Sequence, residues 1–222
     1  MHSPLCGKEQ RISTWGFLNE ILEEQSENGI IRAAGVSNFG VEHLRQLEEA
    51  GLPPPAVNQI EVRNDSEHLL DLHSRLATFS TSEQLHPHLQ QHDIVEYCKS
   101  HDIHVQAYCP LLRGPQSQQS LGDGADWAGM PGKGWDAQVL RELSDKYSKS
   151  IAQILLRWSV QQGYAPQPKA SSLSRLKENI DIFNFMLLPE EIQRIDMEMD
   201  LTEDEAFKGK RIALEWNPVD CP

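Results

Sequence analysis

The sequence predicts an α/β protein in which short strands alternate with helices around a parallel sheet. Strands and helices that alternate at this spacing are typical of βα units. In parallel sheets and barrels the carboxyl ends of the strands carry the ligand site, so polar residues at those ends are expected to border one. Four apolar runs each lead into such a polar cluster: Ser37-Asn38, Asn58-Gln59, Tyr108-Cys109-Pro110 and Gln167-Pro168-Lys169.

Helical periodicity and stop signals predict the elements of the first part of the chain. Residues 12–28 repeat apolar side chains at helical spacing and end at Asn28-Gly29, and a glycine after the last periodic residue is typical of a helix C-terminus. Pro53-Pro54-Pro55 is expected to be a rigid connector. The other elements expected here are a strand over 31–36, a helix over 41–50 and a strand over 56–60.

The second part of the chain repeats the alternation. Pro189-Glu190-Glu191 suits a helix start, because proline is favoured at the first helical position and acids favour the first turn. Residues 113–134 are rich in Gly, Gln, Ser and Pro and are expected to form a long loop. The expected elements are helices over 88–100, 136–147, 150–162, 172–184 and 189–199, with strands over 103–108 and 164–168.

Composition limits the classes of partner. The 222 residues include 20 basic and 33 acidic side chains, a net charge of −13, which argues against nucleic acid or an anionic membrane as the main partner. No apolar run reaches the roughly 18 residues that a transmembrane helix needs. The first residues lack a basic segment followed by an apolar one, so no signal peptide is expected. Four cysteines without CxxC spacing indicate reduced thiols and a cytoplasmic protein.

Three motifs suggest other chemistry but do not carry it. His86-Pro87-His88 with His92 resembles a metal cluster, yet no carboxylate or cysteine completes a ligand set at usual spacing, so no metal is expected. The glycines of 114–134 do not follow a strand in GxGxxG form. Cys109 is interpreted as a small core-facing residue in preference to a reactive thiol.

Five short motifs occur in an order and at a spacing that is specific, although each alone is weak. They are Gly35-Val36-Ser37-Asn38-Phe39, Asn58-Gln59-Ile60-Glu61, Ala107-Tyr108-Cys109-Pro110-Leu111, Pro168-Lys169 and, after Arg175, Glu178-Asn179. Together they resemble the second half of the aldo-keto reductase family, from His2-Ser3-Pro4 to about Asp196. The resemblance implies a partial (β/α)8 TIM barrel, made of about the four to five carboxyl-terminal βα units, that binds NADPH at its carboxyl-terminal mouth.

The resemblance also implies residue roles around NADPH. Ser37, Asn38 and Gln59 would hydrogen-bond the nicotinamide carboxamide, and Tyr108 would stack on the ring. Leu111 and Arg113 would contact the pyrophosphate, although the long loop puts those two contacts in doubt.

The adenosine end of the cofactor would be held after the fourth strand. Lys169 and Arg175 would clamp the 2′-phosphate, a dianion suited to a point charge and a guanidinium. Glu178 and Asn179 would reach the adenine. The family usually has a serine where Ala170 stands, and Ser171 or Ser172 would have to replace its hydrogen bond.

Each of these residues also has a purely structural interpretation. Asn38 and Asn58 are equally suited to satisfying the backbone at strand ends, and Tyr108 to ordinary barrel packing. Lys169 and Arg175 would also suit a solvated helix face. Their occurrence together at the ends of successive strands favours the cofactor site.

Catalysis is where the chain departs from the family. There a tyrosine acts as general acid, an Asp–Lys pair tunes it because its ordinary pKa of about 10 makes it a weak acid near neutrality, and a histidine orients the substrate carbonyl. His2 matches that histidine, but the tyrosine, aspartate and lysine belong to the absent first half. The resemblance therefore implies an oxidoreductase acting on an aldehyde, ketone or alcohol, whose truncated chain is expected to be inactive.

Two further expectations concern completeness. About four βα units cannot close a barrel and would leave bare sheet edges. Such a half-barrel must pair with another copy, stay partly unfolded, or come from a truncated reading frame, and the last is favoured. A non-catalytic, NADPH-binding or regulatory half-barrel that acts with a partner chain is the alternative, and a structural domain without a ligand is a third.

Residues 62–84 interrupt the resemblance. Removing these 23 residues restores Asn-Gln-Ile-Glu-Leu-His-Pro-His-Leu without a gap, and the codons of Val62-Arg63 and of Gln84 permit the letters that border a typical intron. The segment is interpreted as a retained intron. The competing interpretation is a surface insertion with a helical turn at 67–76.

Overall fold

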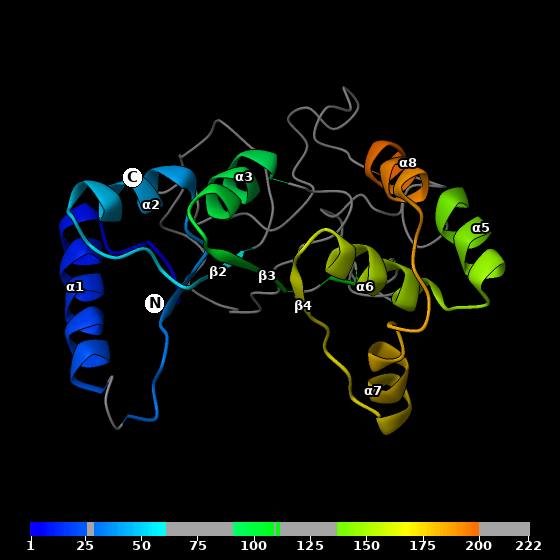
Figure 1. The fold of residues 1–222 in the computed structure, drawn as a ribbon, viewed down its shortest axis with the longest axis horizontal. Coiled ribbons are helices and arrows are strands. Elements are labelled where there is room, and N and C mark those ends of the chain that lie inside the picture. Colours follow the sequence, from blue (N-terminus) through cyan, green and yellow to red (C-terminus); the bar gives the residue numbers. More distant parts are fainter. Residues whose placement is uncertain (26–28, 61–90, 109, 112–136, 200–222) are drawn as a thin grey trace, which may run out of the picture.

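The computed structural model describes residues 1–25, 29–60, 91–108, 110–111 and 137–199 (Figure 1). Its centre is one parallel sheet in the spatial order β1-β2-β3-β4, so each strand lies beside the strand that precedes it in sequence. The strands are β1 (Gly35–Ser37), β2 (Val57–Ile60), β3 (His104–Tyr108) and β4 (Ala165–Gln167). The predicted α/β fold with a parallel sheet is confirmed, and all four carboxyl ends lie at one edge.

Six of the helices form two groups whose members contact one another. α1 packs on α2, while α6 contacts both α5 and α7, and α8 contacts α5. In Figure 1 α1 and α2 lie to the left of the labelled strands, and α5, α6, α7 and α8 lie to their right. The bounds are α1 (Lys8–Gln25), α2 (Val41–Glu49), α3 (His92–Ser100), α5 (Gln138–Tyr147), α6 (Ile151–Gln161), α7 (Leu173–Ile180) and α8 (Pro189–Met199).

The core joins both helix groups to the sheet. Trp15 of α1, Leu47 of α2 and Leu155 of α6 are almost completely buried, as are Ile60 and Ala107 of the inner strands. These positions belong to one continuous cluster of buried apolar side chains. Packing against a shared core is therefore what holds the strands, and with them the residues that follow them, in place.

The strand predicted over 31–36 is wrong at its amino end. β1 pairs with β2 in the register Gly35 to Val57, so residues 31–33 would face Pro53-Pro54-Pro55. Prolines have no N–H to donate to the ladder, and pairing therefore cannot continue in that direction. One hydrogen bond, from Ala56 N to Ala34 O at 3.0 Å, precedes the paired residues.

Two helices also differ from their predicted bounds. α1 begins at Lys8, just after Gly7 with its φ of 72°, four residues before the first periodic apolar side chain. Its first turn is polar, so apolar periodicity cannot detect it. α7 ends at Ile180 instead of residue 184.

Several predictions concern parts of the chain outside the described residues. These are the insertion at 62–84, the loop at 113–134, the contact of Arg113, Cys109, and the first three residues of the helix predicted over 88–100. The remaining strands and helices agree with their predicted ranges within two residues at each end.

Candidate functional site

The carboxyl ends of β1 and β2 are tied together by two hydrogen bonds to one carbonyl. Ser37 Oγ and the Asn38 backbone N–H both donate to Gln59 O, at 2.9 Å each. Asn38 has a φ of 61°, in the left-handed region that asparagine tolerates better than most residues. The chain therefore turns sharply at Asn38, directly after the strand.

This turn places the Asn38 side chain between two other segments. The Tyr108 hydroxyl, at the end of β3, donates to Asn38 Oδ1 at 2.8 Å. Asn38 Nδ2 donates to the backbone carbonyl of His2 at 3.3 Å, while the His2 side chain is exposed. Asn38 is 2% exposed. The structure thus brings three of the predicted residues into one hydrogen-bonded cluster.

Gln59 lies on the adjacent strand end with a partner that the sequence did not suggest. Its Nε2 donates to Gln106 Oε1 of β3 at 3.0 Å, and both side chains are half-buried. A row of amide and hydroxyl groups from three neighbouring strands therefore lines this edge. Such groups can both donate and accept, which is what recognition of a carboxamide requires.

Asn58 supports the turn from beneath. It is fully buried; its Nδ2 donates to Phe39 O at 2.8 Å and its Oδ1 accepts from Phe39 N at 3.4 Å. The structural interpretation that the sequence allowed for Asn58 is thus the one realised. An amide whose same-face neighbours two residues away, Ala56 and Ile60, are apolar was the signal that could have identified it as the support of the turn at Asn38.

The predicted residues of the second group follow β4. Lys169, Ser171 and Arg175 are exposed, and the Lys169 and Arg175 side chains make no ion pair with any residue in the described part of the chain. Ser172 Oγ accepts from Arg175 N at 3.3 Å and caps α7. Ser172 Oγ also lies 3.1 Å from Ser174 Oγ, so it has two partners within the chain and is less suited than Ser171 to bind a ligand.

The remaining predicted residues have mixed placement. Glu178 and Asn179 lie half-buried in the last turn of α7. Leu111, shortly after β3, packs partly buried against the core. The polar residues after β4 and the cluster at Asn38 thus both follow the carboxyl ends of strands of the same parallel sheet.

Each of the other three tyrosines is placed where it cannot serve as a proton donor at this edge. Tyr97 lies on α3, and Tyr147, on α5, donates to Glu191 Oε2 of α8. Burial, with the Asp196 carboxylate adding to it, raises the pKa of Tyr164 to about 12. A raised pKa makes a tyrosine a weaker acid near neutrality.

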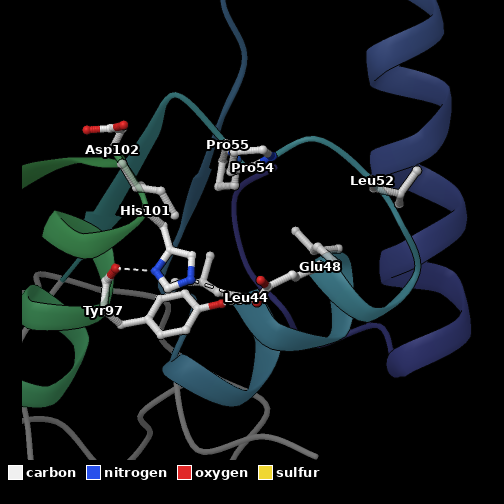
Figure 2. Close-up of a pocket in the computed structure, with 10 residues that line it drawn as sticks. Leu44, Glu48, Leu52, Pro54, Pro55, Tyr97, His101 and Asp102 are labelled. Atoms are coloured by element: carbon white, nitrogen blue, oxygen red, sulfur yellow. Dashed lines mark hydrogen bonds and ion pairs between the residues drawn. The ribbon is translucent and has the colours of Figure 1, made fainter.

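A separate pocket of about 220 Å³ lies between α2 and α3, at the amino ends of the strands (Figure 2). Tyr97 stacks on His101 with ring centroids 3.9 Å apart, and its hydroxyl donates to Glu48 Oε2 at 2.9 Å. Burial and this hydrogen bond raise the pKa of Tyr97 to about 12. None of the residues lining the pocket belongs to the predicted site. Its polar side chains Tyr97, His101 and Glu48 already interact with one another.

The described ranges contain neither a metal-binding cluster nor a membrane-spanning helix. There, no group of three or more His, Cys, Asp or Glu side chains could hold a metal ion. None of the helices in those ranges has both the length and the apolar character needed to cross a membrane.

A parallel α/β sheet with polar groups after its strands places the chain in the α/β class, which many families share, and sequence comparison identifies the family. The family model described as aldo/keto reductase family matches residues 8–198, and the chain therefore belongs to the aldo/keto reductases. A glyoxal reductase of Bacillus subtilis is 34% identical over 90% of this chain and 55% of its own length. A methylglyoxal reductase of Escherichia coli is 30% identical over 88% of this chain and 55% of its own.

Solved structures agree with this assignment. An aldo-keto reductase of Bombyx mori in complex with NADP has a TM-score of 0.66 and 28% identity, covering 89% of this chain and 55% of that one. An aldo-keto reductase complexed with NADPH has a TM-score of 0.70 and 27% identity, covering 100% of this chain and 59% of that one. The chain thus spans about half the length of the curated relatives it matches.

Proposed function

We propose that this chain supplies the cofactor-binding part of an NADPH-dependent aldo-keto reductase that acts on a small aldehyde or ketone. The observation that carries the proposal is the Asn38 amide, held in a left-handed turn between the Tyr108 hydroxyl and the segment at His2. The relatives named as glyoxal and methylglyoxal reductases support a small dicarbonyl as substrate.

The residues of this chain divide the work of binding and orientation. Bound NADPH would supply the hydride. Ser37, Asn38 and Gln59 would hold the nicotinamide carboxamide, and the ring of Tyr108 would present one face of the nicotinamide to substrate. The exposed imidazole of His2, beside Asn38, would orient the substrate carbonyl.

The phosphate end would be bound by the two cations after β4. In a chain of net charge −13, Lys169 and Arg175 are exposed and form no ion pair within the described residues, which suits a phosphate dianion as their partner. Ser171 would add a hydroxyl, and Glu178 and Asn179 would reach the adenine.

Catalytic competence is a separate question from binding. All four tyrosines of the chain have other positions or partners, so we propose that this chain alone binds NADPH without reducing a carbonyl. The same observation supports the second candidate, a non-catalytic half-barrel that acts with a partner chain. An open reading frame upstream that encodes an Asp, a Tyr and a Lys would favour the enzyme over this alternative.

The test is a titration of the purified chain with NADPH and NADH, followed by tryptophan fluorescence, with circular dichroism to establish folding. We expect saturable NADPH binding by a folded chain, and Lys169→Glu should weaken NADPH at least tenfold more than NADH because it reverses the charge facing the 2′-phosphate. Equal weakening of both would show that the phosphate site is misassigned. A folded chain that binds neither nucleotide would overturn the proposed function.

A further inference from the structure

α7 carries three of the proposed adenosine-binding residues, Arg175, Glu178 and Asn179, yet packing alone does not hold it. None of its residues is buried. Leu173, Leu176 and Ile180, which lie on one face at helical spacing, are 68%, 54% and 71% exposed. Apolar side chains left in water contribute little to stability, so the orientation of α7 depends on polar contacts.

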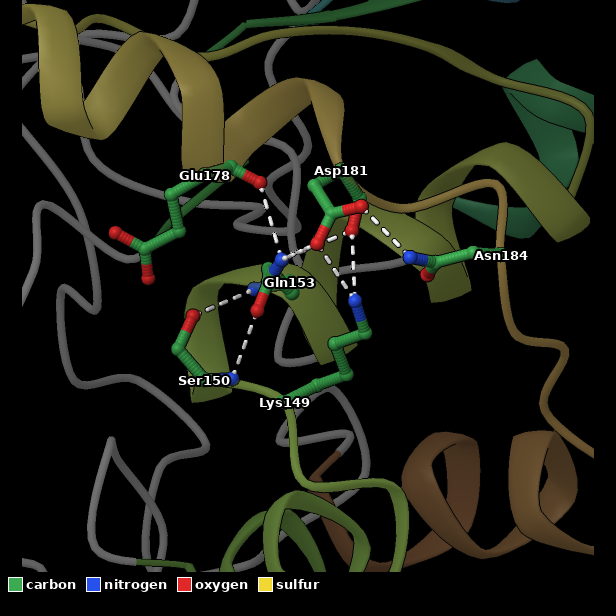
Figure 3. Close-up of polar contacts among 6 residues, drawn as sticks. All are labelled: Lys149, Ser150, Gln153, Glu178, Asp181 and Asn184. Atoms are coloured by element: carbon green, nitrogen blue, oxygen red, sulfur yellow. Dashed lines mark hydrogen bonds and ion pairs between the residues drawn. The ribbon is translucent and has the colours of Figure 1, made fainter.

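Those contacts converge on the carboxyl end of α7 (Figure 3). Gln153 Nε2, from α6, donates to the backbone carbonyls of Glu178 at 3.2 Å and Asp181 at 2.9 Å. The last carbonyls of a helix lack the usual i+4 partner, so they can accept from a cap or from a side chain. Glu178 O accepts from Asp181 N at 3.1 Å as well as from Gln153, which adds a donor from a different helix. Gln153 is 6% exposed, so these hydrogen bonds are shielded from water.

The same glutamine also caps its own helix. Gln153 Oε1 accepts from Ser150 N at 3.0 Å, and Ser150 Oγ accepts from Gln153 N at 3.3 Å, which forms a capping box. The two atoms of the Gln153 amide thus have different functions. Oε1 caps the amino end of α6, and Nε2 donates to the carbonyls at the end of α7. Lys149 Nζ lies 2.7 Å from Asp181 Oδ2, and this ion pair also holds the carboxyl end of α7.

We propose that Gln153 is a positioning residue for the adenosine half of NADPH, an inference that rests on the proposed function. It would act through the backbone of α7 and not by touching the cofactor itself. By holding the backbone of Glu178, it keeps Glu178 and Asn179 in place relative to the sheet. Figure 3 shows the geometry that permits this, with the backbone carbonyl of Glu178 facing Gln153 and its carboxylate directed away.

The test separates the two halves of the cofactor. Gln153→Glu keeps the oxygen that caps α6 but removes the donated hydrogen bonds and places a carboxylate beside two carbonyls and Asp181. We expect affinity for 2′,5′-ADP to fall about tenfold, with affinity for reduced nicotinamide mononucleotide unchanged. Amide hydrogen exchange should become faster in residues 173–180 and not in 151–161. Gln193→Glu is the matched control, because this exposed residue of α8 undergoes the same charge change without a contact to α7.

Each outcome decides the inference. Failure of the unsubstituted chain to bind 2′,5′-ADP overturns the proposed function and the inference with it. If that chain binds but Gln153→Glu binds equally well, the inference alone is wrong. Equal loss of both ligands indicates a general structural role and also overturns it. If Gln153→Glu does not fold, Gln153→Met removes the same donor without adding charge and is measured in the same way.

Discussion

Asn38 has two properties that separate variants can test. Its backbone occupies a left-handed conformation, and its buried amide joins Tyr108 to the segment at His2. Alanine removes the amide and also disfavours the conformation, whereas glycine removes only the amide. The residue therefore allows the cost of the turn to be measured apart from the loss of the binding group.

We expect both Asn38→Gly and Asn38→Ala to lose NADPH binding by at least tenfold. Asn38→Ala should be less stable than Asn38→Gly by about 1–2 kcal/mol, the cost of a left-handed non-glycine residue. Urea denaturation of both variants measures the difference. Unchanged NADPH affinity in Asn38→Gly would argue against a role for this amide in cofactor binding.

Tyr97 gives a prediction about pH. Burial and the bond to Glu48 raise its pKa from 10.0 to about 12 in the folded chain. Because the folded pKa is the higher one, the stabilisation is complete below pH 10 and is lost as pH rises from 10 towards 12. Absorbance titration of phenolate should show this delayed ionisation, and Tyr97→Phe should remove one delayed group and flatten the stability profile over that window. An unchanged profile would contradict the assignment.

At the scale of elements, strand β1 depends on the close approach of β2. A Cβ added to Gly35 would lie 2.8 Å from Val57 O and 3.1 Å from Val57 Cβ, so a side chain here must displace the backbone of the neighbouring strand. Since Ser37 ends this strand and Asn38 directly follows it, such a displacement would also move the proposed binding groups.

We expect Gly35→Ala to destabilise the chain by about 1–3 kcal/mol through overpacking and to weaken NADPH binding. Gly16→Ala in α1 is the matched control, because its added Cβ would meet its nearest neighbour, Leu52, at an ordinary 3.8 Å. Alanine is a better helix former than glycine by about 1 kcal/mol, so the control should be stabilising. Thermal denaturation compares the two, and equal effects would mean that the approach at Gly35 is looser than described.

Sequence patterns predicted which elements exist better than where they end. Apolar periodicity identified the described helices, but the start of β1 depends on its register with three prolines, which no local pattern reveals. The carbonyls at the end of α7 accept hydrogen bonds from Gln153, which is distant in sequence from that helix. Asn38, Gln59 and Tyr108 were predicted as site residues because they lie at the ends of strands and match motifs of the family. The hydrogen bonds of Asn58 and Gln106 could not be predicted without their partners.

At the scale of the whole molecule, the connection from β2 to α3 is unusual. About 30 residues separate Ile60 from His92, whereas βα connections commonly have 2–6 residues. Removing residues 62–84 would leave about eight, much closer to this range. The length alone therefore supports the interpretation of the segment as an insertion, and spliced transcripts containing it would reject a retained intron.

Deletion of residues 62–84 should leave the fold intact and stabilise it by about 1 kcal/mol, because a shorter connection costs less entropy to close. The circular dichroism spectrum and NADPH affinity of the deletion variant should match those of the 222-residue chain. Loss of folding would instead show that the segment contributes contacts that the fold requires.

The order of the strands bears on how the chain is synthesised. Because each strand of the described sheet pairs with the strand made just before it, no strand has to insert between two that are already joined. A nascent chain can add one βα unit at a time as it leaves the ribosome. At about 5–20 residues per second, β4 follows β1 by roughly 7–26 seconds, which is long compared with the collapse of each unit. Each of β2, β3 and β4 is therefore synthesised after a strand with which it pairs.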